Sequence, residues 1–470
     1  MTSIFARKYP LLACALLVLI SFTLTACGGG ASAASSMTGG GNQSAVFVTG
    51  EDAPLPSVLA FNITLTSITL NNSSGSQTVL STPTTIDFAR LLGLRTLVGF
   101  NSVAPGTYDS ATISLSSPVI SYLDLTTSPP SVGTINGTFG TSNATTTTVT
   151  VGLAKAMTVS SNGLAGLHME FDLRKSLQVD SNGQVTGVVN PQINLRAVQP
   201  NAMDAQITDL RGGLVSVNVS GNSFVLQRVG GHNITIDVNS STQFSGSYTL
   251  ASLATPAIIE VDGQVQNDGS IMASEVEVLC TDNGFVSGHI VAVNPASGPA
   301  QSVTLLVGEE LPAISNIQVG FPATIDVSSV TDYDIRHFDN WFTSFLFNSS
   351  SLVAGQRVAI GGNVDSSGNF TPKIVDLRRQ GVVGMLQSGS VQVTSGNVGS
   401  FQLQNNGLLG YVLNAPLTVQ TGNPTIFLNV NGLAGLSSAG TAQIGAAGLM
   451  LKNQNTGNVQ MWARFVDVLP

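Results

Sequence analysis

Charge is scarce in this sequence. Charged residues make up 9% of its 470 residues, against roughly 25% in an ordinary soluble domain. Coiled coils and long surface helices are rich in Glu, Lys and Arg, so the composition argues against both, and it also argues against charge-driven disorder. Gly, Ser, Thr and Asn fill the deficit while hydrophobic residues reach 43%. This mixture favours a strand-rich, turn-rich protein, and the length allows about three domains.

Basic residues are scarcer still. The chain has 17 Lys and Arg against 26 Asp and Glu, which gives a net charge of -9 and a pI near 4.8. Nucleic acids are recognised through a basic face. The balance therefore argues against a nucleic-acid partner.

Cysteine is limited to Cys14, Cys27 and Cys280. The first two lie in or beside an apolar leader, so only Cys280 is left for the folded part and no intramolecular disulfide is expected. Cys280 follows the apolar alternation of Val276 and Val278, which predicts a buried thiol and not a reactive one.

Residues 1–26 have the pattern of a secretory signal, because Arg7 and Lys8 precede an apolar stretch from residue 11 to residue 24. The stretch ends in Leu24-Thr25-Ala26-Cys27, which resembles the lipobox of bacterial lipoproteins. The resemblance implies cleavage before Cys27, lipid on its thiol and an acyl group on its new amino terminus. Several acyl chains at about 0.8 kcal/mol per buried methylene hold a protein on a membrane permanently. A plain secretory signal cut nearby, or an uncleaved membrane anchor, is the alternative.

Residues 27–44 contain two glycine triplets and no apolar periodicity, which predicts a flexible tether. In Gram-negative lipoprotein sorting an Asp after the lipidated Cys directs retention in the inner membrane, and Gly28 stands at that position. The resemblance therefore implies the outer membrane, with the bilayer as a partner through the lipid anchor.

The rest of the chain predicts an all-β fold. Residues 45–202 contain repeated short alternating segments, such as the one with Phe61, Ile63 and Leu65, which indicate strands with one buried face and together a β-sandwich. Residues 88–92 suggest one short helical turn.

Beyond residue 203 the sequence repeats. Residues 235–244 recur as 324–333, and Asp262-Gly263-Gln264-Val265 recurs as Gly361-Gly362-Asn363-Val364. We expect three modules at 203–280, 281–379 and 380–470, the third being the most diverged. Each module has the length of a small barrel. Closure of a barrel removes exposed strand edges, and this chain has too few Lys and Glu to keep such edges from pairing with other chains.

Two known domain families resemble parts of the chain. The segments 49–54, 105–108 (Pro-Gly-Thr-Tyr) and 169–173 (Met-Glu-Phe-Asp-Leu) together resemble a domain of unknown function from bacterial, often acidobacterial, lipoproteins. The segments 212–215 and 262–265 are similar to a second β-repeat family of unknown function that often accompanies it. The resemblance covers residues 45 to about 380. It implies architecture and envelope location, and no catalytic residue.

Sequence motifs for chemistry are missing. The chain has no Gly-x-Ser-x-Gly, His-Glu-x-x-His, Cys-x-x-Cys or Asp-x-Asp-x-Asp-Gly pattern, so we expect neither an enzyme nor a cofactor. The best metal candidate is the group Asp332, Asp334 and His337. The alternative is a solvated loop with Arg336 as its counter-ion. Neighbouring Glu309 and Glu310 are interpreted as part of a loop.

Aromatic residues gather in one place. Phe338, Trp341, Phe342 and Phe345 share the stripe of a helix, which predicts an amphipathic helix inserted in the second module. Such a helix can plug a small barrel, or it can present an exposed aromatic patch to a glycan, a protein or a membrane surface.

These observations favour a non-catalytic binding or structural component of the outer membrane, whose partner is a glycan or an envelope protein. Two other hypotheses stay open. One is a metal-dependent enzyme or metal site around Asp332, Asp334 and His337, and the other is a purely structural spacer.

Overall fold

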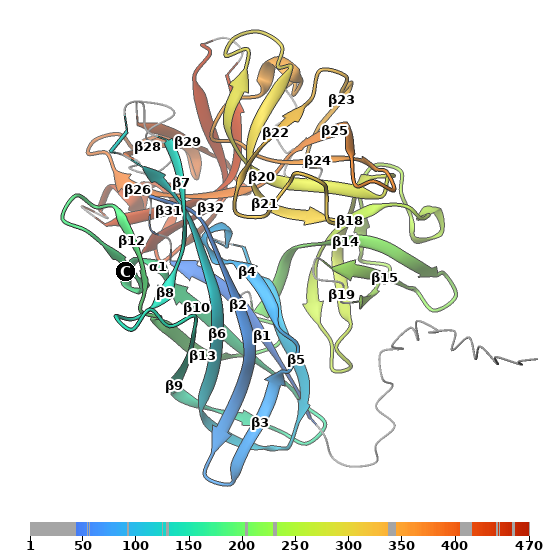
Figure 1. Ribbon diagram of the computed structural model, residues 1–470, viewed down its shortest axis with the longest axis vertical. Helices are drawn as coiled ribbons and strands as arrows, with labels where there is room; N and C mark the ends of the chain where they lie inside the picture. The colour runs from blue at the N-terminus through green and yellow to red at the C-terminus, as the bar shows by residue number, and fades with distance from the viewer. Residues whose placement is uncertain are drawn as a thin grey trace, which may run out of the picture. The chain divides into compact units, whose positions relative to one another are not determined.

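The computed structural model describes residues 44–469 except 54, 56, 92–93, 125, 128–130, 203–204, 229–232, 337–344, 405–415, 439, 441 and 454–455. The predicted all-β fold is confirmed, with a β-sandwich followed by three small barrel-like sheets (Figure 1). Within the described part, no helix has the length and apolar character needed to cross a membrane.

The sandwich is built from two large sheets. One has the order β13-β10-β1-β5, and the other has the order β3-β2-β6-β7, with β4 on β2 and β9 on β6. A small sheet, β11-β12-β8, completes it. The elements are β1 (Ser44–Ala53), β2 (Val58–Asn72), β3 (Gly75–Leu80), β4 (Thr84–Asp87), η1 (Phe88–Arg90), β5 (Thr96–Val103), β6 (Gly106–Asp124), β7 (Ser131–Asn136), β8 (Thr138–Phe139), β9 (Thr146–Val159), β10 (Leu164–Asp172), α1 (Leu173–Ser176), β11 (Leu177–Val179), β12 (Val185–Val189) and β13 (Ile193–Val198).

Alternation along the strands explains the sandwich. On β2, Ile63 and Leu65 are fully buried while the threonines between and after them are partly exposed. They pack against Val46 and Val48 of β1, from the other sheet, in one hydrophobic core. The expected helical turn is confirmed as η1, which carries Arg90 at its end.

The three modules contain the following elements. Module 1 has β14 (Gln206–Asn218), β15 (Ser223–Arg228), β16 (Asn233–Asp237), β17 (Gln243–Phe244), η3 (Leu250–Ser252), β18 (Ile258–Val265) and β19 (Ile271–Cys280). Module 2 has β20 (Gly284–Asn294), β21 (Ser302–Leu311), β22 (Pro322–Asp326), β23 (Asp332–Ile335), η5 (Ser349–Ser351), β24 (Arg357–Val364) and β25 (Phe370–Leu377). Module 3 has β26 (Gln380–Leu386), β27 (Gln392–Ser395), β28 (Val398–Gln404), β29 (Leu417–Thr421), β30 (Ile426–Leu428), α3 (Gly432–Gly435), η6 (Leu436–Ser438), β31 (Gln443–Lys452) and β32 (Val459–Leu469).

Strand pairing follows one scheme in all three modules. The first strand pairs with the penultimate strand and with an earlier one, which is the second strand in modules 1 and 2 (β15 and β21) and the third in module 3 (β28). A short strand pairs in parallel with the last. In modules 1 and 3 a further parallel pairing, β16 with β19 and β29 with β32, closes a five-stranded ring. Among the described strands of module 2, β22 and β25 have no such pairing, so this sheet stays open. Five strands is the number in OB-type barrels, but fold alone assigns no ligand.

A glycine at a β-bulge recurs in the penultimate strand of each module. The register shifts immediately before Gly263, Gly362 and Gly448. A Cβ at these positions would lie 2.4, 2.1 and 1.9 Å from a backbone oxygen of the last strand. Glycine is therefore required for this close approach of two backbones.

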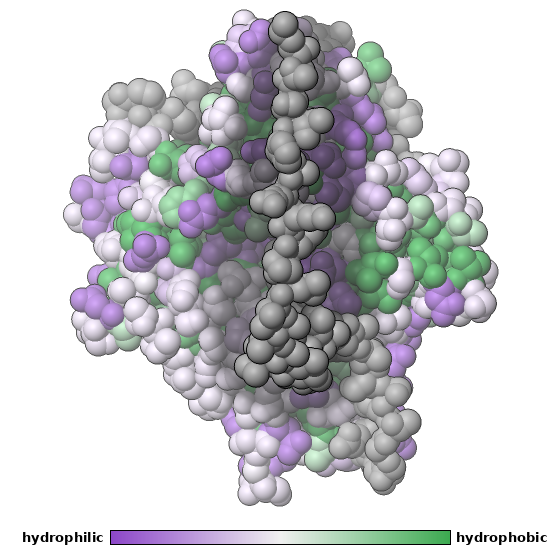
Figure 2. Space-filling view, turned by 45° about the vertical axis from the view of Figure 1, so that its right-hand side comes forward, coloured by the Kyte–Doolittle hydropathy of each residue, from purple (hydrophilic) through white to green (hydrophobic). Residues whose placement is uncertain are grey.

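The modules follow one another closely and share cores. Three residues, 281–283, separate β19 from β20, and two residues, 378–379, separate β25 from β26. Leu449 and Leu451 of module 3 belong to the core of module 2. Phe47 and Leu97 of the sandwich belong to the core of module 1. Residues near the middle of the hydropathy scale cover much of the face in Figure 2, in keeping with the low charge of the sequence.

Candidate functional site: a buried network of ion pairs

More than half of the arginines in the described part of the chain are buried. Of the eleven arginines after residue 44, the six that are buried are Arg95, Arg211, Arg336, Arg357, Arg378 and Arg379. Removing a guanidinium from water costs several kcal/mol unless it is paired and hydrogen-bonded. A charge-poor chain that buries six arginines must therefore supply partners for them.

Glu260 of β18 is the centre of the network. It is 1% exposed. Its two oxygens accept hydrogen bonds from Nε of Arg211 on β14 and Nε of Arg336, each at 2.8 Å. Arg378, which follows β25, also pairs with it. One carboxylate of module 1 thus holds one arginine of its own module and two of module 2.

Glu309 of β21 extends the network to the sandwich. Its carboxylate lies 2.6 Å from Nη1 of Arg211 and 2.7 Å from Nη2 of Arg90. Burial by itself raises the pKa of Glu309, but Arg90, Arg211 and Arg357 together lower it below its ordinary value. Glu309 is therefore ionised, and its ion pairs link module 2 to the sandwich and to module 1.

The loop interpretation of Glu309 and Glu310 was wrong. Both lie in β21, where successive side chains point to opposite faces. Glu310 accepts a hydrogen bond from the backbone N–H of Ile314 at 3.1 Å. Only Glu309 is turned toward the arginines.

The network continues along β19 and β25. Arg336 also pairs with Asp262 at 3.0 Å and Glu275 at 3.5 Å. Arg378 pairs with Asp376 at 2.5 Å and Glu277 at 3.4 Å. The expectation that Arg336 balances Asp332 and Asp334 was wrong, because its guanidinium is turned to carboxylates of module 1. The arrangement fixes charges against one another, which suits positioning of modules better than proton transfer.

His289 on β20 is kept neutral beside the network. Burial, and then the charge of Arg357, lowers its pKa from 6.5 to about 3. Unfolding restores the ordinary pKa, so the unfolded chain binds more protons than the folded chain between pH 6.5 and about 3. The contribution of His289 to stability is therefore complete above pH 6.5 and is lost as the pH falls.

We expect the free energy of unfolding to fall on acidification, because the unfolded chain binds a proton at His289 that the folded chain does not. Below pH 6.5, His289 should lower the free energy of unfolding by up to about 1.4 kcal/mol per pH unit. In His289→Gln this part of the slope should disappear, as measured by urea unfolding at neutral pH and at about pH 5. An identical slope in the two proteins would show that His289 does not titrate on unfolding.

The predicted metal ligands are only partly described. Asp332 and Asp334 are exposed on β23, with half-buried Tyr333 between them, so the two carboxylates share a face. His337 lies outside the described residues. No group of three or more metal-ligating side chains occurs within the described part of the chain. The metal site stays a prediction.

Of the predicted aromatic stripe, Phe338, Trp341 and Phe342 lie outside the described residues. Phe345 lies in an irregular segment and packs against Trp462 of module 3, with ring centroids 5.5 Å apart. The next residue, Leu346, is 77% exposed.

The two remaining cysteine predictions differ in outcome. Cys27 lies outside the described residues, so its lipidation stays a prediction. Cys280 is buried, as expected, and burial raises the pKa of its thiol. A raised pKa disfavours the reactive thiolate.

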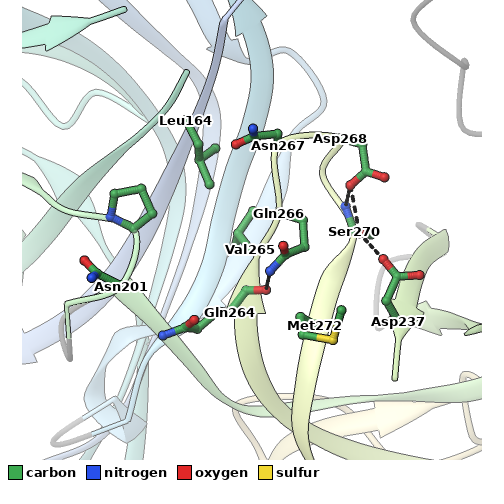
Figure 3. Close-up of a pocket in the computed structure, with 11 residues that line it drawn as sticks. Leu164, Asn201, Asp237, Gln264, Val265, Gln266, Asn267, Asp268, Ser270 and Met272 are labelled. Atoms are coloured by element: carbon green, nitrogen blue, oxygen red, sulfur yellow. Dashed lines mark hydrogen bonds between the residues drawn. The ribbon is translucent and has the colours of Figure 1, made fainter. Parts of the chain in front are cut away.

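Two large hollows border module 1. One of about 630 Å³ lies between Leu164 and Pro200 of the sandwich and the β18–β19 hairpin. Figure 3 shows Asp237 and Asp268 both turned toward Ser270, whose hydroxyl oxygen lies 2.5 Å from a carboxylate oxygen of Asp237 and 2.7 Å from one of Asp268, within donating distance of either. The polar groups at this end of the hollow are therefore already engaged with one another.

The second hollow, of about 580 Å³, lies between modules 1 and 3 and residue 95 of the sandwich. Its arginines also have partners. Arg379 lies over the ring of Phe465, 5.5 Å from the centroid, and Arg464 donates to the carbonyl of Pro424 at 2.7 Å. Nε of Arg95 lies 3.2 Å from Glu51.

The sandwich and module 1 each match a known family model. Residues 44–186 match the model described as Domain of unknown function (DUF4382). Residues 213–277 match the one described as Domain of unknown function (DUF5666). No curated protein matches the chain. The expectation of two domain families of unknown function is confirmed, although the second match ends within module 1 and does not reach residue 380.

Proposed function

We propose that the protein is a lipid-anchored component of the bacterial cell envelope, held at the outer membrane through Cys27, with a non-catalytic structural or binding role. The leader and the sequence around Cys27 support the anchor. The buried network supports the role.

The network is the observation that carries this proposal. Glu260 and Glu309 draw arginines from the sandwich, module 1 and module 2 into one buried set of ion pairs. Linkers of two and three residues leave little freedom between consecutive modules. Ion pairs and short linkers of this kind make the sandwich and the modules one rigid body. Its outer surface is then held at a fixed position beyond the tether of residues 27–44.

The anchor is tested by lipid labelling. We expect the protein made in a Gram-negative host to incorporate radiolabelled palmitate and to sediment with outer membranes. Cys27→Ser should lose the label and be released into the soluble fraction, because the thiol that receives the diacylglycerol is removed.

Cys280→Ser is the matched control, since it removes the buried cysteine and should keep both label and membrane attachment. Unlabelled wild-type protein, or a Cys27→Ser variant that stays on the membrane, would contradict the proposal.

A further inference from the structure

A third hollow lies where the sandwich meets modules 1 and 2. Its volume is about 250 Å³, and it is lined by residues of β2, β4, η1, β14, β15 and β21. Ile86, Leu210 and Val319 form apolar walls. Pockets for drug-sized ligands measure roughly 300–1,000 Å³, so this hollow suits a smaller molecule.

Arg228, the last residue of β15, forms no salt bridge with the described side chains. The carboxylate whose charge acts on it, that of Glu309, is already shared by Arg90 and Arg211. Its one hydrogen bond to the described residues runs from Nη2 to the carbonyl of Leu97 at 3.1 Å. Burial, and then the neighbouring charge of Arg90, lowers the pKa of Arg228 to about 10. It is still charged at neutral pH, and four of its five N–H donors make no hydrogen bond to the residues that the structure describes.

Asn62 of β2 supplies a second, independent donor. Asn62 is 6% exposed, and its Nδ2 has no hydrogen-bond partner among the described residues. Buried amide groups almost always have a hydrogen-bond partner, which is another protein group, a ligand or an ordered water. Asn62 and Arg228 line the same hollow.

The other charged groups of the lining are already engaged. Arg90 and Arg211 share Glu309. Asp87 accepts a hydrogen bond from the backbone N–H of Phe61 at 2.8 Å, and burial raises its pKa. Arg211 also pairs with Glu260, which lies outside the lining. Among the lining residues themselves, three guanidinium groups face two carboxylates, and burial raises the pKa of one of these, so the lining favours an anion.

We propose that this hollow binds a small organic carboxylate, which pairs with the guanidinium of Arg228 and accepts a hydrogen bond from Nδ2 of Asn62. The planar fork of Arg matches a carboxylate with two parallel hydrogen bonds. The guanidinium of Arg228, which has no salt bridge of its own among the described side chains, calls for one negative charge, and the apolar walls call for a short hydrocarbon body. Both features favour a monocarboxylate over inorganic phosphate. The inference does not depend on the lipid anchor.

Calorimetric titration of the folded chain from residue 28 onward tests the proposal with butyrate, benzoate and inorganic phosphate as probes. At least one carboxylate should bind, and more tightly than phosphate. Arg228→Gln should weaken that binding at least tenfold, and Arg228→Lys, which keeps the charge without the fork, should weaken it less. Asn62→Ala should weaken it about fivefold, through loss of one charge-assisted hydrogen bond.

Arg196→Gln is the control, because Arg196 is exposed on β13 and does not line the hollow. Circular dichroism establishes that each variant is folded before titration. Absence of heat with both carboxylates, tighter binding of phosphate, or equal carboxylate affinity in wild type and a folded Arg228→Gln variant would overturn the proposal.

Discussion

Glu260→Gln is expected to lower the free energy of unfolding by about 3–5 kcal/mol. Arg211, Arg336 and Arg378 all pair with this carboxylate, which is 1% exposed. The amide has nearly the same shape, but it carries no charge and offers only one oxygen as acceptor. Three buried guanidinium groups then lose the carboxylate that they share. The expected loss of stability is the free-energy cost of positive charge that stays buried without enough negative charge to balance it.

Urea unfolding followed by circular dichroism measures this loss. Because Glu260 joins module 1 to module 2, the variant should also become sensitive to proteases in the connection 281–283. Glu310→Gln is the matched control, since Glu310 forms no ion pair with the described residues. In the variant, the amide oxygen of the new side chain can still accept the hydrogen bond from the backbone N–H of Ile314. Equal stability of Glu260→Gln and Glu310→Gln would show that the network does not hold the modules.

The sequence predicts the fold well because strand periodicity is a local property. The alternation around Ile63 and Leu65 requires only that one face of β2 be buried, and the structure buries that face. The recurrence of Asp262-Gly263-Gln264-Val265 and Gly361-Gly362-Asn363-Val364 likewise reflects a local requirement, a bulge at which two backbones meet.

The buried network was missed because charge is ordinarily assigned to surfaces and loops. A signal was present in β18. Ile259, Glu260 and Val261 are consecutive and all buried, so this strand is covered on both faces. A strand with two covered faces reads as a near-continuous apolar run, and a charge inside such a run predicts a buried ion pair. The partner cannot be predicted in the same way, because Arg336 and Arg378 lie 76 and more residues away.

The hollow at Arg228 could not be predicted for a related reason. Asn62 comes from the sandwich and Arg228 from module 1, and neither belongs to a motif. Their meeting depends on how the modules dock. The network that sets this docking includes Arg90, Arg211 and Glu309, which also line the hollow. Ligand site and module junction are therefore parts of one structure.

Gly448→Ala is expected to destabilise module 3 by about 3 kcal/mol or more, the upper part of the range for overpacking. The new Cβ would lie 1.9 Å from the backbone oxygen of Trp462. That oxygen belongs to the pairing of β31 with β32, which encloses the bulge. It cannot move aside without loss of ladder hydrogen bonds, whereas a side chain could change its rotamer.

Tryptophan fluorescence during urea unfolding measures this effect, because Trp462 itself lies in β32. Gly152→Ala is the control, since a Cβ there meets nothing within 4 Å and a strand alanine should be neutral or slightly stabilising, by up to about 1 kcal/mol. Gly362→Ala and Gly263→Ala, at 2.1 and 2.4 Å, should follow in that order if the same bulge is built into each module. If Gly448→Ala stayed within about 0.5 kcal/mol of wild type, module 3 would lack the bulge that relates it to the other two. A loss of stability in all three variants, in the expected order, would instead show that every module needs a glycine at this bulge. This would hold even for module 3, whose sequence has diverged most.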